Sequence, residues 1–190
     1  MFLERLPLYG IQKTEYTTKI MTKIKSTPND FNEIKILAES IREIDQIDAD
    51  YVNSVSDEIF KLQPFFLTVL RGYRFDVSND ELEEIMKIYF LVWEYFRLNP
   101  NVQTKRVTES YFTKIQKRNI EMLRYSEGEL KENYKSEIYS YDLQNLKSKS
   151  LLTGIFFRFN ERPTLLKMDI ENKGAIMIGI KSFIECFETI

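Results

Sequence analysis

Three aspartates fall close together in the segment 45–50, and carboxylates at this spacing can hold a divalent cation. Asp45 and Asp48 are three residues apart, so on a helix they would share one face. Mg²⁺ is usually bound through one or two such carboxylates together with waters and the phosphates of a substrate. With Glu84 as a third metal ligand, these residues define one hypothesis, a Mg²⁺-dependent hydrolase of a phosphate ester or a nucleotide.

A simpler interpretation competes with the metal site. Aspartate is a preferred residue at helix caps and turns, and the sequence favours this interpretation for Asp45, Asp48 and Asp50. Helical enzymes that hydrolyse nucleotide pyrophosphates usually combine a Glu-x-x-Glu with a Glu-x-x-Asp. Here Glu81 and Glu84 supply a Glu-x-x-Glu, but the chain contains no Glu-x-x-Asp. The hydrolase is therefore the alternative function, and no cofactor is expected.

A second group of chemically suited residues is the segment Arg71-Gly72-Tyr73-Arg74, which is flanked by further aromatic residues. Arginine and aromatic side chains concentrate binding energy at protein interfaces, and arginine also makes bidentate contacts with carboxylates and phosphates. The competing interpretation is that the aromatic residues pack in the core and that Gly72 caps a helix. Arg71, Tyr73 and Arg74 are therefore candidate binding residues.

The composition excludes much of enzyme chemistry. The 190 residues include no histidine and a single cysteine, Cys186. Imidazole acid–base catalysis, Ser–His–Asp and Cys–His nucleophiles, and zinc sites built from histidine or several cysteines all lack a necessary residue. Cys186 lies between aromatic residues and beside glutamates, which predicts a buried, unreactive thiol. A chain with one cysteine fits a reducing compartment best.

The formal net charge of −2 conceals two segments of opposite sign. Segment 30–58 holds nine acidic residues against two basic ones, and segment 105–118 holds five basic residues against one acidic residue. The acidic segment would suit a basic protein partner, and the basic segment would suit a nucleic acid. Exposed charge runs usually have no binding role, so we do not expect nucleic acid as a partner. The sequence leaves open whether the two segments face each other.

Helical periodicity is the strongest pattern in the chain. Apolar residues cover most of the circumference of a helix expected over 78–98, and such a helix is usually enclosed by others. Ser78 and Glu81 form the S-x-x-E capping box at its start. The fold expected is therefore all-α: a single domain over 1–190, with about six to eight helices around this central helix. Its main neighbours are expected to be the helices near 107–125 and 34–62.

Some boundaries stay open at this level. Segment 31–62 keeps one apolar register, so it is either one long helix or two helices. Poor helix formers gather near 45–50, which favours a break or a bend there. Further helices are expected near 16–24 and 130–141. The apolar run 174–180 favours a helix, but period alone does not exclude a strand.

The first residues lack the basic region and apolar run of a signal peptide, and no apolar stretch approaches the length needed to cross a bilayer. The sequence therefore predicts a non-catalytic, cytoplasmic helical protein that binds another protein or associates with itself. The candidate binding residues are Arg71, Tyr73, Arg74, Asp45, Asp48 and Asp50.

Overall fold

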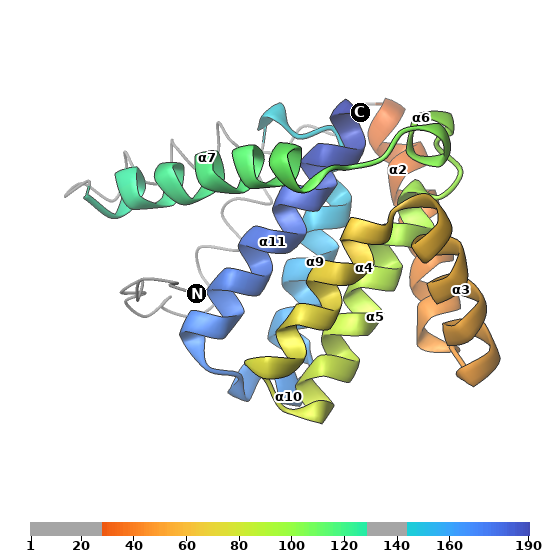
Figure 1. Cartoon of the computed structure of the whole chain (residues 1–190), viewed down its shortest axis with the longest axis horizontal. Coiled ribbons are helices and arrows are strands. Elements are labelled where there is room, and N and C mark those ends of the chain that lie inside the picture. Colours follow the sequence, from red (N-terminus) through yellow and green to blue (C-terminus); the bar gives the residue numbers. More distant parts are fainter. Residues whose placement is uncertain (1–27, 129–143) are drawn as a thin grey trace.

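The computed structural model describes residues 28–128 and 144–190, and every regular element in these two ranges is helical. The all-α prediction is confirmed. Seven of the helices in these ranges have nine or more residues, and α6, α10 and the 3-10 helix η1 are shorter (Figure 1). The elements in chain order are α2 (Pro28–Asp45), α3 (Ala49–Leu62), α4 (Pro64–Gly72), η1 (Tyr73–Phe75), α5 (Asn79–Phe96), α6 (Pro100–Thr104), α7 (Glu109–Gly128), α9 (Lys149–Glu161), α10 (Pro163–Lys167) and α11 (Ile170–Thr189). The helices expected near 16–24 and 130–141 lie outside the described residues.

Helix α5 is the centre of the bundle, as its pattern predicted. Its capping box is formed: the Ser78 Oγ accepts a hydrogen bond from the Glu81 N–H, and the Glu81 carboxylate accepts one from the Ser78 N–H at 2.8 Å. The second half of the helix is buried on nearly every side, from Ile88 through Glu94. Helices α2, α4, α9, α10 and α11 all pack against α5.

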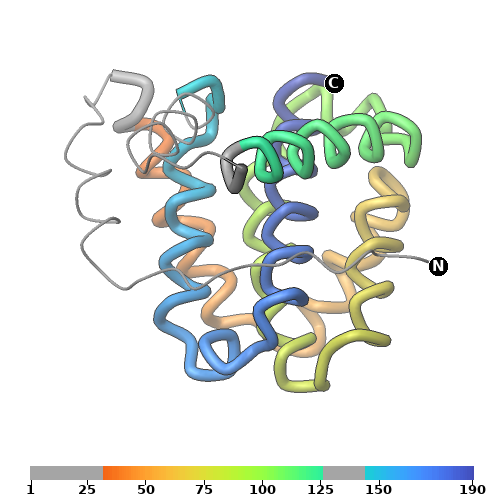
Figure 2. Tube along the Cα trace, turned by 90° about the vertical axis from the view of Figure 1, so that its left-hand side faces the viewer, coloured from red at the N-terminus to blue at the C-terminus, as the bar shows by residue number. Residues whose placement is uncertain are grey.

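The helix near 107–125 was expected to pack on the central helix, and this prediction was wrong. The observed helix, α7, packs chiefly on α11. In both views α7 lies across the top of the bundle, while α11, α5 and α9 run side by side beneath it (Figures 1 and 2). The reason is that α11 already occupies that side of α5. Phe187 of α11 contacts Trp93, and Phe183 of α11 meets Phe112 of α7 with 4.2 Å between ring centroids.

The other expected neighbour, segment 34–62, divides as predicted. Helix α2 ends at Asp45 and α3 begins at Ala49. Asp48 is the N-cap of α3, and its side chain accepts a hydrogen bond from the Tyr51 N–H at 2.8 Å. The break lets α2 pack on α5 and α9 while α3 turns away to pack on α4. The run 174–180 is part of the 20-residue helix α11, so the strand alternative was wrong.

Aromatic rings fill the contact between α4, α5 and α11. The Phe66 ring lies 4.7 Å from that of Phe183, 5.2 Å from that of Phe187 and 4.8 Å from that of Tyr89. All four residues are fully or almost fully buried. Much of the high aromatic content therefore forms the core.

Gln63, between α3 and α4, joins two distant parts of the backbone. Its buried side-chain amide donates to the carbonyls of Val102 and Lys105, both at 2.6 Å, and its oxygen accepts from the Val107 N–H at 2.9 Å. One side chain thus satisfies three backbone groups of the segment that leads into α7.

No helix of the described residues is both long enough and apolar enough to span a bilayer.

The close approach of α4, α5 and α11 depends on Gly179. A Cβ added there would lie 2.3 Å from the Tyr73 hydroxyl, which also accepts a hydrogen bond from the Tyr89 hydroxyl at 3.1 Å. We expect Gly179→Ala to lower the free energy of unfolding by about 2 kcal/mol. In the Tyr73→Phe background the same change should cost much less, because the clashing oxygen is gone. Urea denaturation of the four proteins of this cycle measures the difference.

Gly72 is the matched control. It has ordinary right-handed helical backbone angles, so it is not the left-handed helix cap that its position suggested, and a Cβ there would meet no atom within 4 Å. Gly72→Ala should raise the free energy of unfolding by roughly 0.5 kcal/mol. Equal effects at the two glycines would contradict the packing described here.

Candidate functional site

The three aspartates of segment 45–50 have separate local partners. Asp48 caps α3, and Asp50 is exposed in the first turn of that helix. Asp45, at the end of α2, accepts from Arg158 at 2.6 Å and from Arg162 at 3.1 Å. The capping interpretation therefore describes Asp48, while Asp45 joins α2 to α9.

The alternative metal ligands Asp45 and Glu84 do approach the same group, but that group is a cation. The Arg162 Nε lies 3.8 Å from Glu84 Oε2, and Lys87 lies 3.2 Å from the other Glu84 oxygen. Within ranges 28–128 and 144–190 no three Asp, Glu or Cys side chains are placed to hold a metal ion. In the described residues, the Mg²⁺-dependent hydrolase therefore has no observation in its favour.

The candidate binding residues of segment 71–74 separate into a core residue and two surface residues. The Tyr73 hydroxyl lies in the core against Tyr89 and Gly179, and burial raises its pKa to about 12. Arg71 and Arg74 are exposed. The Arg74 guanidinium lies 4.6 Å from the centre of the exposed Phe75 ring, in a cation–π contact. We therefore leave Tyr73 out of any binding surface and keep the two arginines.

Arg71 lines a pocket of about 140 Å³ between α3, α4 and α5. The pocket is half open to solvent, and its wall is mostly apolar. Its floor consists of buried residues, and its rim of partly exposed and exposed ones. The lining residues are Ser56, Leu67, Leu70, Arg71, Leu82, Met86 and Phe90.

Two exposed side chains are relevant to this pocket, Phe60, which is outside its lining, and Arg71, which belongs to it. Phe60 lies one helical turn after Ser56, on the same side of α3, and 64% of its surface is exposed. The Arg71 guanidinium has no carboxylate within ion-pair distance among the residues that the structure describes. We call Ser56, Phe60, Arg71 and the apolar lining of the pocket the α3–α4–α5 surface. It combines an apolar hollow, an exposed aromatic ring and an uncompensated charge.

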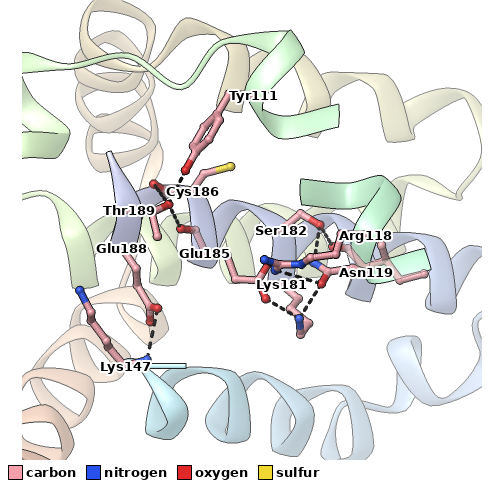
Figure 3. Close-up of polar contacts among 11 residues, drawn as sticks. Tyr111, Arg118, Asn119, Lys147, Lys181, Ser182, Glu185, Cys186, Glu188 and Thr189 are labelled. Atoms are coloured by element: carbon pink, nitrogen blue, oxygen red, sulfur yellow. Dashed lines mark hydrogen bonds and ion pairs between the residues drawn. The ribbon is translucent and has the colours of Figure 1, made fainter. Parts of the chain in front are cut away.

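A buried polar network between α7 and α11 was not foreseen from the sequence. Figure 3 shows Arg118, Asn119 and Lys181 converging on Glu185. Asn119 also donates to the Ser182 hydroxyl at 3.0 Å and accepts from Lys181 at 2.8 Å. The spacing of four residues between Lys181 and Glu185 is typical of an ion pair on one helix and is visible in the sequence. Their shared partner on α7, Asn119, could not be predicted from spacing. These groups satisfy one another, so the network holds α7 in register on α11.

A second buried carboxylate joins α5 to α3. Glu94 accepts from the Tyr51 hydroxyl at 2.6 Å and from Arg97 at 2.8 Å, and Arg97 also pairs with Glu58 at 2.7 Å. Burial and the hydrogen bond to Glu94 raise the pKa of Tyr51 well above its usual value. Partial burial and the adjacent Glu94 carboxylate likewise raise the pKa of Glu43.

These contacts answer the question of the two charged segments. Asp45 of the acidic segment pairs with Arg158 of α9 and with Arg162, and Glu58 pairs with Arg97. Arg118 of the basic segment pairs with Glu185 of α11, while Lys35 pairs with Glu39 inside the acidic segment. Among the described residues, none of these ion pairs joins the acidic segment to the basic one.

Searches of known protein families, of curated proteins and of solved structures found no match to this chain.

Cys186 is buried as predicted, and burial together with the neighbouring Glu185 raises the pKa of its thiol to about 12. At pH 8 the native thiol should therefore be protonated and shielded. We expect no reaction with 5,5′-dithiobis(2-nitrobenzoic acid) over an hour, and one equivalent of reaction once the chain is unfolded in guanidinium. Rapid labelling of the folded protein would show that Cys186 is accessible.

The α7–α11 network gives a stability test. Glu185→Leu removes the acceptor of three donors, of which Lys181 is largely buried. We expect the free energy of unfolding to fall by about 3 kcal/mol, because breaking a buried ion pair leaves an uncompensated charge. Glu121, which is exposed and lies 4.0 Å from Lys117 on α7, is the control. Glu121→Leu should change the value by less than about 0.5 kcal/mol in the same urea titration.

Proposed function

We propose that this chain is a cytoplasmic, non-catalytic protein that binds another protein through the α3–α4–α5 surface. The observation that carries the proposal is the open apolar pocket with Arg71 at its rim. An apolar anchor side chain that fills a pocket, next to an arginine, is the usual composition of the energetic centre of a protein interface.

The size of the pocket suits such an anchor. Full burial of one leucine, methionine or phenylalanine side chain contributes about 1.5–3 kcal/mol. Phe60, beside the pocket, would lose its contact with water in the same complex. An interface needs further contacts around this centre, and the exposed turns of α3 and α4 provide the area for them.

Most of the other arginines near the core have a different role from the one proposed for Arg71. Arg97, Arg118, Arg158 and Arg162 each pair with a carboxylate of this chain. Their charges are therefore already used within the fold. Arg42, Arg71 and Arg74 are exposed and have no carboxylate within ion-pair distance among the described residues, and of these three Arg71 alone lines the pocket.

Site-directed photo-crosslinking tests the proposal in the source cells. With p-benzoyl-phenylalanine in place of Phe60, we expect a crosslink to one other protein, and Arg71→Glu should abolish it by removing the complementary charge. Sedimentation of the purified protein shows whether the crosslinked species is instead a second copy.

Tyr125 supplies the control position. Its side chain is 71% exposed, and it lies near the end of α7, which packs on α11 and points away from α3 at this end (Figure 1). The same photo-crosslinker in place of Tyr125 should not capture that protein. Equal capture from both positions, or none from Phe60, would contradict a specific surface at α3, α4 and α5.

A further inference from the structure

We propose that the segment of the partner that occupies the α3–α4–α5 surface is an amphipathic α-helix bearing a carboxylate that pairs with Arg71. This inference rests on the proposed function and adds the chemistry of the bound segment.

The spacing of the lining residues favours a helical ligand. On α5, Leu82 and Met86 lie four residues apart and are partly exposed at the rim, while Phe90, four residues further on, is buried in the floor. On α4, Leu67 and Leu70 are also buried in the floor, and Arg71 is exposed at the rim. A hollow of one side chain's size between two such helices fits the apolar anchor of a third helix that packs across them.

The polarity of the wall distinguishes a helix from an extended peptide. An extended segment needs backbone hydrogen-bond partners along its length, and recognition of this kind normally uses an exposed sheet edge. The described residues contain no strand, so they offer no sheet edge to such a peptide. The lining of the pocket has only two polar side chains, those of Ser56 and Arg71. A helix satisfies its backbone groups internally, so it can lie against an apolar wall without leaving them unpaired.

The charge at the rim selects the sign of the ligand. Arg71 is the one charged residue of the lining, and it has no carboxylate partner among the described residues. Arg74 in η1, three residues after Arg71, is a second exposed arginine close to it in sequence. Beside the rim, the charge of Glu83 on α5 is compensated by Lys87 at 2.7 Å. A glutamate or aspartate on the bound helix, one turn from its apolar anchor, would therefore complete an ion pair with Arg71.

Selection of displayed peptides on the full chain tests this inference. Two 18-residue libraries compete in the selection, a helix-forming scaffold randomised on one face and a fully random library. We expect the enriched peptides to combine apolar residues at helical spacing with a glutamate or aspartate one turn from them. Arg71→Glu should weaken binding of such a peptide about tenfold, and a peptide whose acidic residue is replaced by lysine should recover that loss.

Two further variants separate the possible failures. Arg124→Glu, at an exposed position on α7, changes the net charge equally and should not affect binding. Met86→Gln should weaken the binding of any peptide that lies in the pocket, and thermal melting of each variant verifies that it is folded.

The pattern of sensitivities decides between the inferences. Peptides sensitive to Met86→Gln but not to Arg71→Glu would overturn the carboxylate inference and leave the surface intact. Enrichment of extended or proline-rich peptides would overturn the helix. No enrichment, or peptides insensitive to both variants, would count against the proposed surface itself.

Discussion

The enclosure of α5 is the constraint on which the rest of the structure depends. From Ile88 to Glu94 every residue of this helix is buried, so water must be excluded from its whole circumference. No single neighbour can do this, and α2, α4, α9, α10 and α11 together surround it. Because these positions are then occupied, α7 is left to cross over α11, and α3 is left to pack on α4 at the edge of the bundle. The pocket between α3, α4 and α5 lies at this edge.

Enclosure on all sides also brings polar groups into the core, and three of them have internal partners that join separate elements. Glu94 binds Tyr51 and Arg97, Glu185 binds the α7–α11 network, and Gln63 holds the chain that enters α7. Apolar contacts alone would allow helices to slide or rotate at little cost, whereas a displaced buried polar group would lose its hydrogen bonds. These side chains therefore determine how the helices are aligned. They also show that the charged side chains Glu94, Arg97 and Glu185 serve the fold.

The proposed surface lies at an edge of the helical bundle. The side of the pocket formed by α5 belongs to the central helix, so it should change little when a ligand binds. The α3 side carries Phe60 and is joined to the central helix through Glu58 and Arg97. This arrangement suits recognition of a preformed surface, such as a helix, and it requires none of the catalytic groups that the composition lacks.

The sequence by itself determined the helices, because their signals act between neighbours along the chain. The capping box of Ser78, the capping role of Asp48, the break between α2 and α3 and the apolar circumference of α5 were all predictable from spacings of three and four residues. Only the tertiary structure decided that Tyr73 points into the core, that Asp45 meets an arginine of α9 and the one that follows this helix, that α7 packs on α11 and that Arg71 borders a pocket. These facts depend on how far each helix is rotated and displaced relative to helices distant in sequence. Periodicity shows which face of a helix is buried, but the partner of that face depends on how all the helices fill space around α5.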